Sequence, residues 1–581
     1  MKDFLALLTK RFDIPKKDKI EKAIQSFSVT EKTIFGVLVA IFIFSGIGLL
    51  EQVSLAFQTE VPAYGGELTE GVIGTPRFVN PLLAMSDTDK DLVALAYSGL
   101  LKSGTDGTLV ADLADHYTIS PDGLTYDFVI RKDATFQDGT PVTASDIEFT
   151  ILKAEDPTIK SPKQANWDGV TVRVVSDNEI QFILKQPYGP FLDNMTLGIL
   201  PKHIWSSVAP EQFPFSQYNV NPIGSGPYKV TSVSHDSFGI PTSYTLKSFS
   251  NYLSGQPFIT TFTMKFYQDE NALINAYTAG EIESAYGFSA QTVKSIQNTN
   301  ANVVETVLPR IFGVFFNQNQ ARVLANPEVR KALDQSLDKD AIVKDVLFGY
   351  GTTIDGPVPP KTKNYSHGTT TEDARLTMAS TTLTKAGWKK NPSTGIWEKK
   401  TKSGTQTLSF SIATGDAPEL KAVADKIKAN WTALGALVDV QVYEPSDLNQ
   451  NIIRPRKYDA LLFGEIIGRS MDLYPFWHST ERNDPGLNIA LYVNAAADKL
   501  LEAGRATSDP ALRDTKYAAF EQIIQNDKPA IFVYAPSFLY VVPKKIQNIE
   551  IDYLTVPSER FASINQWYVE TSHIWNIFIK K

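Results

Sequence analysis

The longest unbroken apolar run of the chain lies near its N-terminus. The 18 residues from Thr33 to Leu50, TIFGVLVAIFIFSGIGLL, contain no charge. At 1.5 Å per residue they make a helix about 27 Å long, close to the roughly 30 Å hydrocarbon core of a bilayer. A helix of this length in a soluble protein usually shows a polar stripe, and this segment shows none. The pattern therefore predicts one transmembrane helix, which we place at residues 33–55.

The charges on either side of this helix predict its orientation. Residues 1–32 carry eight Lys or Arg against five acids, whereas residues 51–76 carry no Lys or Arg. By the positive-inside rule the N-terminus is cytoplasmic and the large remainder is extracytoplasmic, in a single-pass protein of the bacterial cell membrane. Ser54 and Ala56 would permit cleavage after Ala56, but the long basic region and long apolar stretch favour an uncleaved signal anchor.

Two short segments flank the predicted anchor. Residues 1–32 form the cytoplasmic N-terminal segment, whose apolar residues recur at helical spacing between positions 4 and 27. This segment either lies on the membrane surface or is a frayed basic tail, and the sequence favours neither. Residues 56–64 form a tether to the exterior domain.

Beyond residue 65 the apolar pattern mixes strands with helices. Residues 98–205 are rich in hairpin signals, with the turns SPDG and SDNE joining alternating apolar runs. Residues 405–465 instead read as β-α-β-α-β, which predicts a parallel sheet with crossover helices. The predicted elements are Thr407–Ile412, Pro418–Leu434, Leu437–Tyr443, Ser446–Ile453 and Tyr458–Phe463. Ligands bind beyond the carboxyl ends of such strands, and Phe463-Gly464-Glu465 is one of those ends.

Composition narrows the function classes. The net charge of −8 and the pI near 5.5 argue against nucleic-acid binding, because neutralising phosphates requires a basic surface. The chain has no cysteine, which excludes disulfides, a thiolate nucleophile, a cysteine zinc site and a lipidated cysteine. The 33 Phe, 23 Tyr and 8 Trp fit either several large cores or an aromatic-lined cleft.

Motifs for catalysis or metal binding are missing from the sequence. The six histidines show no metal-ligand spacing. The acids Asp87, Asp89 and Asp91 resemble a calcium loop, but Leu92 and Ser98 stand where Gly and Glu are needed, so they indicate a helix start. The segment GSGPYK matches neither nucleotide-binding glycine motif. We therefore expect no enzyme activity, no metal and no cofactor.

Three segments resemble the family 5 extracellular solute-binding proteins, the peptide- and nickel-binding components of ABC importers. They are Leu113–Phe149 (LADHYTISPDGLTYDFVIRKDATFQDGTPVTASDIEF), Asn221–Val230 (NPIGSGPYKV) and Pro327–Val343 (PEVRKALDQSLDKDAIV). Tyr117 stands where the family usually has tryptophan. Each match alone is weak, but their order and spacing together are specific, and the similarity extends from about Gly65 to near the C-terminus.

The resemblance implies an α/β, two-lobe, type II periplasmic-binding-protein-like fold. Lobe one would comprise residues 65–310 and 546–581, with 98–205 as its extra sheet-rich subdomain, and lobe two residues 311–545. It also implies a monomer that captures a peptide or another small solute in the cleft between the lobes and delivers it to an ABC permease. The alternative is a tethered sensory or scaffold module with the same fold and no transporter.

The family's cleft segments fall at Gly74–Asn80, Gly224–Pro227, Phe315–Asn317 and Phe463–Tyr474. Peptide binders of the family place an aspartate near Ile467 for the ligand's ammonium group, so Glu465 or Asp472 would have to replace it, and Arg469 either favours an anionic group or is solvated. For each position the alternative is an ordinary turn or core residue. The predicted ligand-binding residues are Thr75, Pro76, Phe78, Ser225, Gly226, Phe316, Asn317, Phe463, Glu465, Ile467, Arg469 and Asp472.

Overall fold

The computed structural model describes residues 17–296, 301–360, 370–402 and 404–575. The chain divides into a large compact unit, residues 64–570, and a small unit formed by the residues before 64 and after 570. The first half of the predicted cytoplasmic segment, residues 1–16, lies outside the described residues.

The small unit contains the apolar helix α3. This helix extends from Val29 to Ala56, and its stretch Val29–Leu49 has a mean hydropathy of 2.1 with none of it buried. Within the described part of the chain it is the one helix long and apolar enough to cross a membrane. A shorter helix, α2 (Lys17–Gln25), precedes it, and strand β1 (Gln58–Ala63) follows and pairs with the last strand, β23 (Glu570–Trp575).

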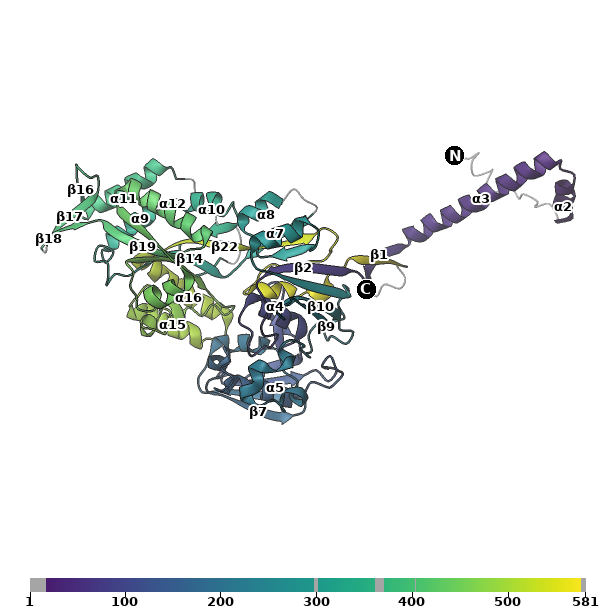
Figure 1. The fold of residues 1–581 in the computed structure, drawn as a ribbon, viewed down its shortest axis with the longest axis horizontal. Coiled ribbons are helices and arrows are strands. Elements are labelled where there is room, and N and C mark those ends of the chain that lie inside the picture. Colours follow the sequence, from purple (N-terminus) through teal and green to yellow (C-terminus); the bar gives the residue numbers. More distant parts are fainter. Residues whose placement is uncertain (1–16, 297–300, 361–369, 403, 576–581) are drawn as a thin grey trace, which may run out of the picture. The chain divides into compact units, whose positions relative to one another are not determined.

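One sheet of twelve strands runs through the large unit (Figure 1). Its central strand β22 has 14 residues and pairs with strands from both the first and the second half of the chain. In spatial order the sheet contains β20 (Leu437–Tyr443), β19 (Ser409–Gly415), β21 (Ala460–Ile466), β14 (Arg310–Phe316), β22 (Ala530–Pro543), β12 (Ser284–Tyr286), β2 (Glu67–Ile73), β11 (Thr261–Tyr267), β10 (Pro241–Ser248) and β9 (Tyr228–His235), while β13 (Ala301–Val307) and β15 (Gly351–Thr353) also pair with β22.

The predicted βαβ region is confirmed. Strand β19 pairs in parallel with both β20 and β21, and helix α12 (Pro418–Leu434) connects β19 to β20. Pro418 begins this helix and Gly435, at φ 108°, ends it, as its sequence signals predict. The helix predicted at Ser446–Ile453 is instead a short α-helix, α13 (Pro445–Asp447), that continues as the π-helical turn η5 (Leu448–Ile453).

Helices cover both faces of the sheet in the second half of the chain (Figure 1). One face packs against α9, α11 and α12 around a core that includes Phe410 and Trp431. The other face packs against α14, α15 and α16 around Phe315 and Trp477. The bounds of the helices are α9 (Pro327–Ser336), α10 (Lys339–Asp345), α11 (Glu372–Lys385), α14 (Tyr474–Trp477), α15 (Ala495–Ala506) and α16 (Pro510–Asp527), and the hairpin strands β16 (Lys389–Lys390), β17 (Trp397–Thr401) and β18 (Gly404–Thr407) lie after α11.

The first half of the chain contributes the predicted sheet-rich subdomain. Its four-stranded antiparallel sheet has the order β5-β6-β8-β7, and both predicted hairpins are present. Helix α5 and one aromatic core cover this sheet. The elements of this half are α4 (Asp87–Ala96), β3 (Leu101–Ser103), β4 (Leu109–Ala111), β5 (Ala114–Ile119), β6 (Thr125–Ile130), α5 (Ala144–Glu155), η1 (Gln164–Asn166), β7 (Val170–Ser176), β8 (Glu179–Leu184), η2 (Gly189–Thr196), α6 (Lys202–Trp205), η3 (Pro210–Phe215), η4 (Gln217–Asn219), α7 (Glu270–Thr278) and α8 (Ala290–Ile296).

The C-terminal segment returns to the first half and is held there by a buried arginine. Arg560, in the short helix η7 (Pro557–Phe561), is fully buried, and its guanidinium lies 2.6 Å from a carboxylate oxygen of Glu70 and 2.6 Å from one of Asp91. Burial raises the pKa of Asp91 to about 6, although Arg560 opposes the shift. Because Glu70 belongs to β2 and Asp91 to α4, the Arg560 side chain holds η7, β2 and α4 together. A last turn, η8 (Ile564–Gln566), precedes β23.

Candidate ligand-binding site

The segment that carries Thr75, Pro76 and Phe78 is held against the start of α4. The Asp89 carboxylate accepts the backbone N–H of Arg77 at 2.7 Å and that of Phe78 at 3.0 Å. Thr75 is exposed, Pro76 is buried and Phe78 is half-buried against the core of the first half. Of the acids that resemble a calcium loop, Asp89 thus completes the helix cap with Ser86 and holds the neighbouring turn, while Asp91 pairs with Arg560.

The GSGP turn packs against the end of α4. A side chain added at Gly224 would place its Cβ 2.1 Å from the carbonyl oxygen of Ala96, and one at Gly226 would place it 2.5 Å from the backbone nitrogen of Tyr97. Glycine is therefore required for the close approach of two backbones. Ser225 is buried, and its hydroxyl has no hydrogen-bond partner among the described residues. The turn thus packs directly against the backbone of Ala96 and Tyr97.

Phe316 and Asn317 lie at the end of β14 inside the second half of the chain. Phe316 is fully buried in the core shared with α9 and α12. Asn317 donates its amide to the carbonyl of Arg456 at 2.8 Å and accepts the backbone N–H groups of Asn319 and Gln320, each at 3.1 Å. These contacts give Phe316 a core role and Asn317 a turn-forming role.

Residues 463–467 form the end of β21 and the turn after it. Phe463 is half-buried, and Ile467, at the position of the family's aspartate, is fully buried. Glu465 is 4% exposed, and its carboxyl oxygens have no hydrogen-bond partner in the described part of the chain. Burial raises the pKa of Glu465 well above its usual range, and the neighbouring Trp477 indole lowers it by less. Burial thus favours the neutral, protonated form of the Glu465 carboxyl group.

Arg469 reaches from the second half of the chain to the first. Its guanidinium forms an ion pair with Glu559, donates to the carbonyl of Gly107 and lies 3.4 Å from the hydroxyl of Thr555. The next residue, Ser470, donates its backbone N–H to Asp193 at 3.1 Å. The side chain of Arg469 is only 11% exposed, so these contacts are largely shielded from water. The alternative that Arg469 is merely solvated does not hold.

Asp472 pairs within the second half. The Arg505 guanidinium lies 2.6 Å from its carboxylate and stacks on the ring of Tyr474 at 3.9 Å. The same guanidinium is 5.8 Å from the ring of Tyr188, a residue of the first half. The negative charge of Asp472 is therefore already paired with Arg505, and Arg505 adds a second contact between the halves.

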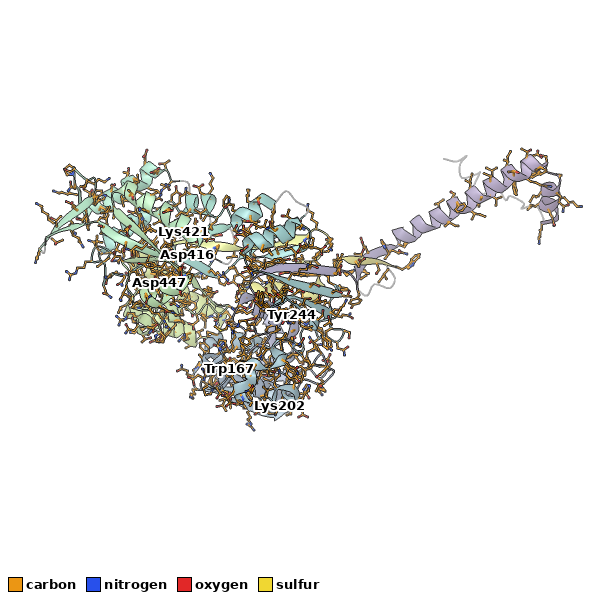
Figure 2. All side chains as sticks on the ribbon, in the orientation of Figure 1. Trp167, Lys202, Tyr244, Asp416, Lys421 and Asp447 are labelled. Carbon is orange, nitrogen blue, oxygen red and sulfur yellow. The ribbon has the colours of Figure 1, made fainter. Side chains whose placement is uncertain are left out.

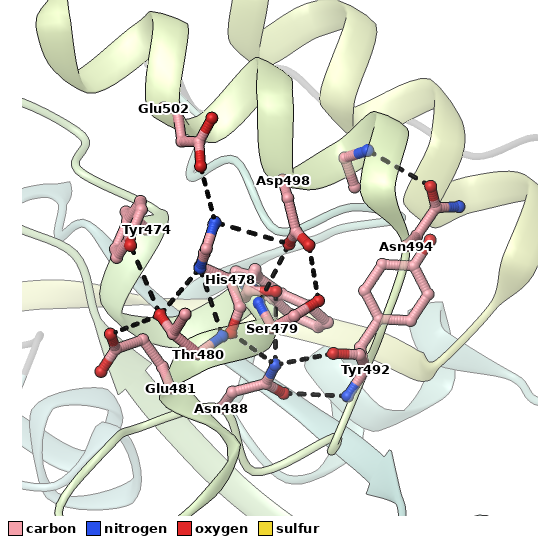
Figure 3. A network of polar contacts seen from close by, with 12 residues as sticks. Tyr474, His478, Ser479, Thr480, Glu481, Asn488, Tyr492, Asn494, Asp498 and Glu502 are labelled. Atoms are coloured by element: carbon pink, nitrogen blue, oxygen red, sulfur yellow. Dashed lines mark hydrogen bonds and ion pairs between the residues drawn. The ribbon is translucent and has the colours of Figure 1, made fainter.

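Trp477, His478 and Ser479, the WHS segment, follow this loop and are held by a polar network (Figure 3). Asn488 donates its amide to three backbone carbonyls, and the Ser479 hydroxyl donates to Asp498 at 2.6 Å. His478 is 7% exposed, and its Nδ1 lies 2.8 Å from the hydroxyl of Thr480. Since Ser479 bonds to Asp498 and not to the histidine, this grouping is not the nucleophile–base arrangement of a hydrolase.

A cavity of about 370 Å³ lies between elements of the first half of the chain and the C-terminal segment, beside the Arg469 contact. Its wall comes from α4, β3, η1, η2 and η7 and includes Tyr97, Trp167 (labelled in Figure 2), Asp193 and Glu559. None of the twelve predicted residues lines it, although Pro227 of the GSGP turn does. Its lining comes from segments hundreds of residues apart, so no local sequence signal could have revealed it.

An ion pair between the partly buried Lys102 and the buried Asp112 forms one side of this cavity. The Lys102 ammonium group lies 2.8 Å from the hydroxyl of Ser254, 3.2 Å from that of Tyr252 and 4.0 Å from the Asp112 carboxylate. Burial raises the pKa of Asp112 and lowers that of Lys102, and each partner opposes the shift of the other. The pair gives the apolar cavity polar groups of fixed position, as small-ligand pockets have. Within the described residues, no grouping of His, Asp and Glu could hold a metal ion.

The large unit matches known proteins along most of its length. Residues 108–485 match the model of the bacterial extracellular solute-binding proteins, family 5. The chain belongs to this family. It is 28% identical to the oligopeptide-binding protein AppA of Bacillus subtilis (strain 168) over 517 residues, which cover 87% of this chain and 92% of AppA.

Two similar solved structures confirm the predicted type II periplasmic-binding-protein fold. AppA from Bacillus subtilis in complex with a nonapeptide is 27% identical, with a TM-score of 0.66, and the match covers 88% of this chain and all of that one. CtaP, an ABC transporter substrate-binding protein from Listeria monocytogenes, is 24% identical with a TM-score of 0.73 over 87% of this chain and all of that one. Family 5 members are solute-binding proteins and not enzymes. An extracellular family together with one apolar N-terminal helix fits a membrane-anchored or exported protein.

Proposed function

We propose that this family 5 protein is the substrate-binding receptor of an ABC importer that captures peptides outside the membrane and delivers them to a permease. The single observation that carries the proposal is the similarity to AppA, described as oligopeptide-binding and solved with a nonapeptide. The dipeptide-binding protein of Escherichia coli (strain K12), 23% identical over 506 residues, is a further peptide-binding relative. These relatives favour a transport role over a sensory or scaffold module.

We propose that the solute binds between lobe one, residues 65–310 and 546–581, and lobe two, residues 311–545. The cavity beside the Arg469 contact supports this placement, because Asp193 and Glu559 line it and both bind the loop from lobe two. Strand β22 and the β13–β14 segment cross from one lobe to the other, so they are the candidate hinges. Of the twelve residues predicted for ligand binding, Arg469 has the best-supported place, as the contact that closes the cleft.

We propose that α3 remains attached as a single-pass anchor with the N-terminus in the cytoplasm. The charge asymmetry across the helix supports this orientation, and the candidate cleavage site lies in the last turn of α3. The intact mass of protein extracted from membranes should therefore include residues 1–56. A mature protein that begins after Ala56 and appears in the soluble exterior fraction would refute the anchor.

We further propose that the chain has no catalytic activity, since the Ser479, His478 and Asp498 grouping serves to hold the WHS segment. Peptide binding is tested on the full chain, purified in detergent micelles, by calorimetric titration with alanine peptides of two to six residues. We expect binding of at least one length, and loss of peptide uptake when the gene is deleted in the source bacterium. No binding of any length together with unchanged uptake would refute the proposed function.

A further inference from the structure

The cavity beside Arg469 has three lysines and three acids in its wall. The lysines are Lys90, Lys102 and Lys163, and the acids are Asp112, Asp193 and Glu559. A ligand that displaces water from this space must complement the charges that the protein leaves unmatched. The pairing of these six groups therefore indicates which ligand chemistry the cavity accepts.

All three acids are already matched by the protein. Asp112 is paired with Lys102. Glu559 binds Arg469 and accepts the backbone N–H of Thr555 at 2.7 Å. Asp193 accepts the backbone N–H of Ser470 at 3.1 Å and lies 4.0 Å from the Arg469 guanidinium. No carboxylate of the cavity wall is left for a cationic ligand group while the Arg469 contact is closed.

The lysines are not matched in the same way. Lys163 is half-buried, and its ammonium group has no carboxylate or hydrogen-bond acceptor among the described residues. Lys90 has one partner, Asp87 at 3.8 Å, and that pair is exposed at the surface, where ion pairs contribute little. Burial lowers the pKa of Lys163, and the nearby positive charge of Lys90 lowers it further. The cavity thus has an unmatched positive charge at the Lys90–Lys163 side.

We propose that Lys163, supported by Lys90, binds the carboxylate of a short peptide inside this cavity. The inference rests on the proposed function and adds which end of the cargo is recognised and by which lobe. A carboxylate is the anionic group that every unmodified peptide carries, and an ammonium–carboxylate contact in a shielded site is a strong, charge-assisted hydrogen bond. The recognition is built entirely from lobe one, since η1, α4 and the residues around them supply this side of the wall.

The size of the cavity limits the ligand. Small-molecule sites are about 300–1,000 Å³, and this cavity of about 370 Å³ lies at the lower end. It therefore favours a peptide of two or three residues, or the terminal residues of a longer one. The carboxylate has two sources in peptides, the C-terminus and an acidic side chain, and the experiment separates them.

Calorimetric titration of the full chain in detergent micelles would use four probes. They are dialanine, trialanine, trialanine with an amidated C-terminus, and the amidated tripeptide Ala-Glu-Ala. We expect trialanine to bind roughly tenfold or more tightly than its amide, because the amide removes the charge that Lys163 matches. If Ala-Glu-Ala amide binds as tightly as trialanine, the side chain also supplies the carboxylate; if it binds like trialanine amide, the C-terminus is the source.

Substitutions then locate the charge. Lys163→Met should weaken trialanine binding to the level of the amide and leave amide binding unchanged. Lys90→Met should shift the same ratio in the same direction by less. Lys132→Met is the matched control, since Lys132 is an exposed lysine of lobe one outside the cavity, and its substitution changes the net charge equally.

Two results overturn the inference while leaving the proposed function intact. One is equal affinity of the native chain for trialanine and its amide, a comparison that requires no variant to fold. The other is a Lys163→Met protein that loses affinity for both probes to the same degree. Failure of every alanine peptide from two to six residues to bind would instead overturn the peptide proposal itself.

Discussion

Removing the Arg469 guanidinium should open the two lobes in the absence of peptide. The side chain is 11% exposed and joins lobe two to Glu559 and to the Gly107 carbonyl of lobe one. Truncating one partner of a shielded charge pair costs about 2–5 kcal/mol. Glu559 keeps two bonds from Thr555, at 2.7 and 2.8 Å, and is hydrated once the lobes separate, so the lower part of that range applies. We therefore expect about 2–3 kcal/mol for Arg469→Ala, which lowers the closed-to-open ratio roughly 30- to 150-fold.

The chain's lack of cysteine makes this measurable without background labelling. Cysteines replacing the exposed Ser176 in lobe one and Ser393 in lobe two would carry a fluorophore pair for energy transfer. In Arg469→Ala the peptide-free distance distribution should shift to longer values. Arg454→Ala is the control, because Arg454 pairs with Asp484 inside lobe two at an exposed site. An unchanged distribution in Arg469→Ala would show that this contact does not govern closure.

Three further predictions concern stability. Glu465→Gln should stabilise the protein increasingly as pH rises above about 5. Burial raises the pKa of Glu465 in the folded state, so unfolding releases its proton. The unfolding free energy of the native chain therefore falls by up to about 1.4 kcal/mol per pH unit, and that of the variant does not. Denaturant titrations at pH 5 and pH 7 measure this, and an equal difference between the two proteins at both pH values would contradict it. Arg560→Leu should cost about 3–5 kcal/mol in the same assay, because two buried carboxylates lose their common partner, and a loss below about 1 kcal/mol would refute this reasoning. Gly226→Ala should lower the unfolding free energy by about 1–3 kcal/mol or more, because its Cβ would clash with the backbone of Tyr97. Gly468→Ala is the control and should be neutral, since nothing lies within 4 Å of the added Cβ. Equal effects of the two substitutions would count against the clash.

Sequence reasoning succeeded where the signals are local. Helix α12 has the predicted bounds because Pro418 and Gly435 determine its ends without help from the rest of the fold. The turns SPDG and SDNE specify their hairpins in the same way. The π-helical turn at Leu448–Ile453 was missed, because a period of 3.6 residues does not distinguish an α-helix from a local i→i+5 turn.

The site could be predicted only in part, because its contacts are long-range. The Arg469 and Glu559 pair is separated by 90 residues, and nothing near either residue indicates the other. The sequence makes Asp472 a candidate replacement for the family's aspartate, but the structure pairs it with Arg505, which its own segment does not indicate. The unmatched Lys163 is visible only once the partners of every other charge in the cavity wall are known.

The pairing of β1 with β23 has a mechanical consequence for the segment that follows α3. The chain passes between the small and large units twice, once after β1 and once before β23 ends the described part of the chain, and Thr571 donates to Glu60 across the pair at 2.5 Å. A single extended strand would act as a swivel, free to rotate about its bonds. A hydrogen-bonded ribbon of two strands resists torsion, so the segment that follows α3 is a structured element of the small unit and not a free linker.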